Sequence, residues 1–156
     1  MDGTYRKFLE SGLDLTALGV ERRAENAPYF CTPKGASIFG WAGVDGIHFC
    51  FVRGFVTQIF AVSPANGPGE FVHPIAADFA DFLRLLLACG DSAALEQAWM
   101  WDEGTFDTFL QENPPTPEQR SVLEQLSETL DLTPMEQPWA YLRDQRERLD
   151  AGKLRF

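Results

Sequence analysis

The sequence predicts an α+β fold: an antiparallel β-meander sheet with helices at the N-terminus and a C-terminal helical run packed on it. Short apolar runs cut by Gly, Pro and Asp-Gly fill residues 29–63, and helical periodicity lies before and after them. The strand-like runs follow one another without intervening helices, which is typical of α+β rather than alternating α/β chains. A length of 156 residues fits a single domain over residues 1–156 with an ordinary core.

The sheet is predicted from five apolar runs. We expect strands over residues 29–32, 37–43, 47–52 and 55–62, and a short edge strand over 71–75 that ends at Pro74. Because the runs are apolar at alternating and at consecutive positions, both faces of the sheet need a cover.

Asp45-Gly46 is the strongest local signal for a hairpin, because a type I′ turn needs positive φ at both central residues. As a two-residue loop it would pair Val44 with Ile47 and Ala42 with Phe49. Small residues would then lie opposite large ones. Arg53-Gly54 is expected to close the next hairpin.

Helical spacing of apolar residues predicts helices over residues 4–11, 76–88, 91–101, 105–111, 117–130 and 139–149. Gly12 and Gly90 are expected to end the first two, and Thr116 to Gln119 forms a capping box for the fifth. In the third helix, Trp99 and Trp101 point about 160° apart at 100° per residue. One of these indoles must therefore be covered by a later segment or exposed.

Charge is unevenly distributed. The net charge is −10, and residues 64–142 hold fourteen acidic residues against Arg84 and Arg120, while the last fourteen residues return to about +2. Such a field repels phosphate backbones and attracts basic proteins. We therefore expect no direct nucleic-acid binding and a basic protein partner. The alternative is that the acidic surface only keeps the protein soluble.

Cysteine usage and hydropathy indicate a cytoplasmic protein. Cys31, Cys50 and Cys89 lack CxxC spacing and lie in apolar runs, which is typical of reduced core thiols. No signal-peptide pattern opens the chain and no apolar run is long enough to span a membrane.

The sequence offers no catalytic or metal motif, so we expect no enzyme activity, metal or cofactor. His48 and Cys50 lie on one strand face and cannot by themselves close a tetrahedral zinc site, and nothing places Cys31 beside them. A nucleophile pair of Cys31 or Cys89 with His73 matches no known motif. A small enzyme that uses His48 or His73 is the alternative.

The segment from Asp91 to Glu118 contains seven acidic residues and no basic one. Aromatic residues ringed by acids are typical of an interface for a basic partner. We expect partner binding by Asp91, Glu96, Trp99, Trp101, Asp102, Glu103, Asp107 and Glu112. The alternative is that both indoles belong to the core and the acids form a solvated rim, since the acids do not share one helical stripe.

A family resemblance covers roughly residues 29–110. It is carried by Gly40-Trp41 with Asp45-Gly46, then Phe60-Ala61-Val62, then Val72-His73-Pro74-Ile75-Ala76 leading into Phe79 and Phe82-Leu83. These residues resemble the SUKH superfamily, which includes bacterial immunity proteins of polymorphic toxin systems and a fungal cell-wall synthesis regulator.

The resemblance implies a SUKH-like, non-catalytic α+β domain that binds another protein. In bacteria such domains typically neutralise a toxin, often a nuclease, that is encoded beside them. The alternative is a regulatory or scaffold module in a cell-envelope or signalling pathway. The family supplies no catalytic residues to carry over, and its binding surfaces vary.

Overall fold

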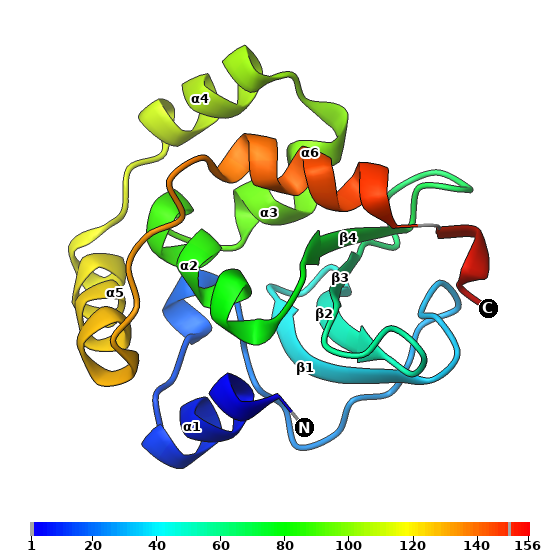
Figure 1. Ribbon diagram of the computed structural model, residues 1–156, viewed down its shortest axis with the longest axis horizontal. Helices are drawn as coiled ribbons and strands as arrows, with labels where there is room; N and C mark the ends of the chain where they lie inside the picture. Colours follow the sequence, from blue (N-terminus) through cyan, green and yellow to red (C-terminus); the bar gives the residue numbers. More distant parts are fainter. Residues whose placement is uncertain (1, 150) are drawn as a thin grey trace.

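The computed structural model describes residues 2–149 and 151–156 and confirms the α+β meander. Four antiparallel strands pair in chain order: β1 (Ala36–Ala42), β2 (Ile47–Val52), β3 (Ile59–Val62) and β4 (Val72–Ala76). Figure 1 shows helices gathered on one side of this sheet. The strand β4 lies at the edge, as predicted, although it includes Pro74 and continues to Ala76.

The β1–β2 hairpin forms, but its predicted register is wrong. Ala42 pairs with Ile47, so the loop holds four residues instead of two. Positive φ occurs at Gly43 (66°) and Gly46 (82°) and not at Asp45, so the turn is not type I′. The first and last residues of the loop, both glycines, therefore adopt the left-handed conformation that the turn requires.

A β-bulge at Phe39 shifts the register a second time, because Gly40 faces Phe49 while Ile38 faces Cys50. A Cβ atom on Gly40 would lie 2.5 Å from Cγ1 of Val20, so only glycine lets the chain before the sheet pack this closely. The bulge therefore lies where a distant segment presses on the strand, which local pairing patterns do not encode.

Two predicted strands differ from the structure. Residues 29–32 form a turn, in which the amide of Thr32 donates to the carbonyl of Tyr29 at 3.1 Å. The predicted strand over 55–62 is limited to β3, because residues 53–58 form the connection from β2, with positive φ at Gly54 and Val56. Cys31 and Phe55 of these segments pack against the sheet from outside it, whereas Phe30 and Val56 are exposed.

One side chain caps two helices, α1 (Gly3–Ser11) and α2 (Phe79–Cys89). Oδ1 of Asp2 accepts from two backbone amides in the first turn of α1 at 2.9 and 3.3 Å, and Oδ2 accepts from the amide of Phe79 at 3.0 Å. Gly12 ends α1 with φ at 72°, as predicted. The shared cap ties the N-terminal helix to the helix that follows the sheet.

The remaining helical elements are η1 (Thr16–Leu18), α3 (Ala93–Gln97), η2 (Ala98–Met100), α4 (Glu103–Glu112), α5 (Pro117–Leu130), α6 (Pro138–Arg148) and η3 (Ala151–Lys153). The predicted helix to Trp101 is thus split into α3 and a 3₁₀ turn. The capping box of Thr116 and Gln119 at the start of α5 is confirmed. Helix α6 runs along β4 (Figure 1).

Both sheet faces are covered, as the apolar pairs predicted. On the helical side, rings of β1 and β2 pack against α2, with Phe39 and Phe82 centroids 5.3 Å apart. On the other side, Cys50 and Phe60 pack with Cys31 and with Leu154 near the end of the chain. Segments from both ends of the sequence therefore close the second core.

Candidate interaction surface

Ser92 holds the start of the acidic segment in place through two hydrogen bonds. Its hydroxyl donates to the carbonyl of Gly19 at 2.8 Å, and its amide donates to the carbonyl of Leu18 at 2.9 Å. Beside it, Oδ1 of Asp91 accepts from the amide of Ala93 at 3.0 Å. The N-cap of α3 is Ser92, and the half-buried carboxylate of Asp91 binds the amide of the first residue of the helix, which is a local structural function.

Glu96 on α3 is half-buried, and burial raises its pKa to about 7. A carboxyl group with such a pKa is only partly ionised at neutral pH. Glu96 therefore adds less negative charge to a steering field than the exposed acids of α4 do.

Trp99 packs on the sheet. Its ring stacks on His73 of β4 with centroids 4.5 Å apart and an interplanar angle of 14°. Its Nε1 atom is buried and finds no hydrogen-bond partner among the described residues. Nε2 of His73 lies 3.1 Å from a carboxylate oxygen of Glu70 without hydrogen-bond geometry, and burial lowers the pKa of His73. Trp99 is thus half-buried against β4.

Trp101 is half-buried, like Trp99, and it lines an open hollow. Its ring packs on Phe109 of α4 with centroids 4.8 Å apart, and its carbonyl accepts from Nε1 of Trp139 at 3.1 Å. Met100, beside it, is 51% exposed. The hollow has a volume of about 560 Å³ and is lined by Trp101, Asp102, Gly104, Thr105, Thr108, Phe109 and Glu112.

The acids of α4 lie on two sides of that helix. Asp102 caps it, because Oδ1 accepts from the amide of Thr105 at 2.8 Å, and this hydrogen bond lowers the pKa of Asp102. Glu103 and Asp107 are exposed four residues apart and share one face, while Glu112 belongs to the hollow.

The structure therefore brings together only part of the predicted set. We define the acidic surface as Trp101, Asp102, Glu103, Asp107 and Glu112, whereas Asp91, Glu96 and Trp99 have other neighbours. Thr105, Thr108 and Phe109 also line the hollow, although they were not predicted as site residues. Their helical spacing relative to Glu112 was a signal that could have found the two threonines.

His48 is a buried structural residue of β2. Its Nδ1 atom lies 2.8 Å from the carbonyl oxygen of Gly46, and Nε2 lies 2.9 Å from Oγ1 of Thr32. A carbonyl oxygen can only accept, so Nδ1 carries the proton and Nε2 accepts from the hydroxyl. Burial lowers the pKa of His48. The neutral ring thus has both nitrogen atoms engaged.

The three cysteines are all buried with free thiols. Burial raises the pKa of Cys50 and of Cys89 to about 12, so both are protonated at neutral pH. Within residues 2–149 and 151–156, no three His, Cys, Asp or Glu side chains are grouped to hold a metal ion. In the same residues, no helix combines the length and apolarity that crossing a bilayer requires.

Comparison of the chain with protein-family models, curated proteins and solved structures found no match. The resemblance of residues 29–110 to the SUKH superfamily therefore stays a prediction.

Proposed function

We propose that the protein is a non-catalytic protein-binding domain of the immunity type, which acts in the cytoplasm and neutralises a basic toxin such as a nuclease. The observation that carries the proposal is the acidic surface. There, the half-buried indole of Trp101 lines a hollow flanked by carboxylates, and the segment 91–118 that forms it contains no basic residue. Aromatic groups supply contact area that loses water on binding, and the acids speed encounter with a positive partner.

The chemistry of the partner follows from the charge. A nuclease carries basic residues that attract phosphate groups, and a surface of spaced carboxylates presents negative charge to the same residues. The SUKH resemblance supports the immunity function independently of the charge, because it rests on residues of the sheet and α2. The alternative function is that of a regulatory or scaffold module, which would bind a housekeeping protein instead.

The test is binding to the toxin domain encoded beside the gene of this protein, measured by biolayer interferometry at low and high salt. The triple variant Asp102→Lys, Glu103→Lys, Asp107→Lys is expected to slow association about tenfold at low salt, because it reverses the steering charge. The matched control reverses three exposed acids on α5 and after it, Glu124→Lys, Glu128→Lys and Glu136→Lys.

Trp101→Ala is expected to weaken binding by about 2 kcal/mol, as for a contact residue at the centre of an interface. Unchanged association of the first triple variant would remove the acidic surface from the proposal. An equal loss in both triple variants would show that only net charge matters. A stable complex with a housekeeping enzyme, and none with a toxin, would favour the regulatory function.

A further inference from the structure

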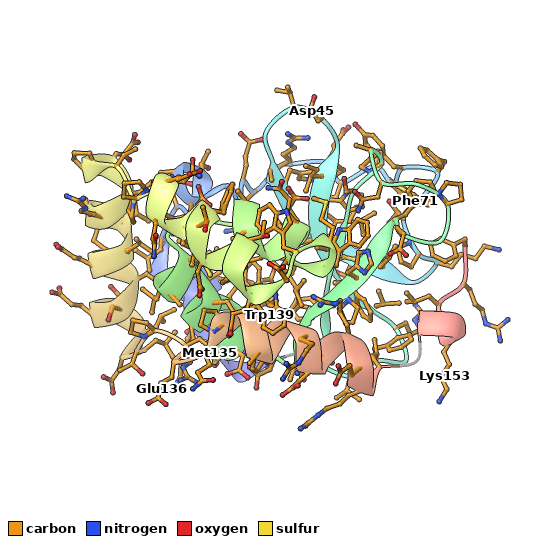
Figure 2. The ribbon with its side chains drawn as sticks, turned by 90° about the horizontal axis from the view of Figure 1, so that it is seen from above. Asp45, Phe71, Met135, Glu136, Trp139 and Lys153 are labelled. Carbon is orange, nitrogen blue, oxygen red and sulfur yellow. The ribbon has the colours of Figure 1, made fainter. Side chains whose placement is uncertain are left out.

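The opposite end of the molecule carries an apolar pocket. It has a volume of about 380 Å³ and is lined by Phe30, Cys31, Pro68, Gly69, Phe71, Val72, Leu154 and Phe156. Phe30 is 74% exposed and Phe156 is 59% exposed, and the ring of Phe30 meets that of Phe71 edge-on with centroids 5.3 Å apart. Figure 2 shows Phe71 and Lys153 at the end of the molecule that lies away from α5. Large exposed aromatic side chains around a pocket mark an interaction site.

A second hollow, of about 260 Å³, adjoins the pocket through the last residues of the chain. Its charged lining is entirely basic: Lys34, Arg53, Lys153 and Arg155. These four side chains are exposed, and none of them forms an ion pair with a described residue. In a chain of net charge −10, four cations that have no ion pair among the described residues make the local electrostatic potential positive.

Residues 153–156 lie between the two hollows, and their side chains line one hollow and the other in turn. Leu154 and Phe156 line the apolar pocket, while Lys153 and Arg155 line the basic hollow. The segment is fastened by a hydrogen bond from the amide of Lys34 to the carbonyl of Arg155 at 2.6 Å. One short segment of chain thus presents an apolar side and a cationic side to a ligand that crosses it.

We propose that this basic end, defined as the apolar pocket and the four cations, binds an acidic peptide segment that carries an aromatic or aliphatic anchor residue. The anchor enters the pocket beside Phe71, and neighbouring carboxylates pair with the cations. Several spaced carboxylates on a chain can reach several of the four cations, whereas an amphiphile with one head group reaches fewer. The remaining surface repels an acidic peptide, so the field of the whole protein directs it to this end.

This inference does not depend on the proposed function, because the partner has the opposite charge and the residues are different. Its test uses a short fluorescein-labelled peptide in which two Phe are flanked by Glu, with binding followed by fluorescence anisotropy. Two matched peptides separate the contributions: one replaces Phe by Ser, and the other replaces Glu by Lys. Each is expected to bind about tenfold more weakly or not at all, and the affinity of the first peptide falls as salt is added.

Two variants locate the site. Lys153→Glu with Arg155→Glu, and separately Phe30→Ser, are expected to weaken binding about tenfold, because they remove charge pairing and anchor contact respectively. The control Arg6→Glu with Lys7→Glu makes the same change of net charge on exposed residues of α1 that line neither hollow, and it is expected to bind normally. Circular dichroism checks that each variant is folded.

The proposed site would be overturned if the control variant lost as much affinity for the peptide as the other variants. It would also be overturned if both the Lys153→Glu, Arg155→Glu variant and Phe30→Ser bound the peptide with undiminished affinity. Binding to vesicles of phosphatidylglycerol without peptide binding would reassign the surface to a membrane. Self-association in sedimentation velocity that the charge-reversal variant abolishes, again without peptide binding, would reassign it to a second copy of the chain. Loss of toxin binding with peptide binding intact would overturn the proposed function alone.

Discussion

The acidic surface and the basic end differ first in how the chain builds them. The acidic surface comes from residues 101–112, so consecutive residues of one helix and its cap form it. The basic end combines residues from four segments that lie far apart in the sequence, near 30–34, 53–55, 68–72 and 153–156. A surface of the first kind can be found by inspecting a sequence, while one of the second kind exists only after folding.

The two regions also differ in what holds them. The acidic surface rests on local hydrogen bonds such as the cap of Asp102 on Thr105. The basic end rests on the second core, where His48 is bonded to Thr32 and Cys31 is buried. We therefore expect substitutions under the basic end to cost more stability than those under the acidic surface, and the following predictions test this.

The largest effect is expected for His48→Ala. It removes a fully buried ring that contacts Trp41 at 4.7 Å between centroids, and it leaves the hydroxyl of Thr32 and the carbonyl of Gly46 without this partner. We expect a loss of about 3 kcal/mol in the free energy of unfolding. Urea denaturation measures it, with Val44→Ala at a 93% exposed position of the same hairpin as the control. If His48→Ala lowers the free energy of unfolding as little as Val44→Ala does, the expected difference between the basic end and the acidic surface would be refuted.

The second largest effect on stability is expected from acidification. Burial lowers the pKa of His48 and of His73 below the ordinary value of 6.5, so the unfolded chain takes up protons before the native one. The stability that depends on neutral rings is present above pH 6.5 and is lost as pH falls below it. Each histidine contributes a slope of at most about 1.4 kcal/mol per pH unit. Urea midpoints measured between pH 7.5 and 5 should show a smaller slope for His48→Asn. If the unmodified protein and His48→Asn showed identical slopes of stability against pH, the neutral state of His48 in the folded protein would be contradicted.

Glu96→Gln, on α3 beside the acidic surface, is expected to change stability in the opposite direction. Its folded-state pKa of about 7 lies above the ordinary value of 4.5, so ionisation opposes folding as pH rises from 4.5 to 7. Allowing for solvent screening, we expect Glu96→Gln to raise the free energy of unfolding by about 1 kcal/mol at pH 8. The gain should vanish near pH 4, and Glu103→Gln at an exposed site is the control. A gain that does not change with pH would point to packing instead.

The smallest effect is expected for Thr116→Ala at the start of α5. It removes a hydroxyl that accepts from the amide of Gln119 at 3.1 Å in an exposed capping box. A loss of about 0.5–1 kcal/mol is expected from thermal or urea denaturation. Thr116→Ser keeps the acceptor and should retain most of the stability. A loss near that of His48→Ala would contradict the small contribution expected of a cap that rests on local hydrogen bonds.

Features that depend on residues close together along the chain could be predicted from the sequence. The order of periodicities predicted the α+β meander. Gly12 at the end of α1 and the capping box at the start of α5 were predicted because each depends only on residues of its own helix end. The acidic segment was visible for the same reason. Even so, the sequence placed Asp91, Glu96 and Trp99 with the acids of α4, because adjacency along the chain does not state which face each residue shares.

Features in which segments far apart in the sequence contact one another depend on the tertiary structure. The register of β1 follows a bulge where Val20 presses on Gly40, and residues 29–32 lie across the sheet face instead of in the sheet. Trp99 packs on the sheet because β4 places His73 against it. The basic end likewise forms only when the chain end returns to Lys34. Packing between segments far apart in sequence sets these contacts, and no local pattern records which segments will meet.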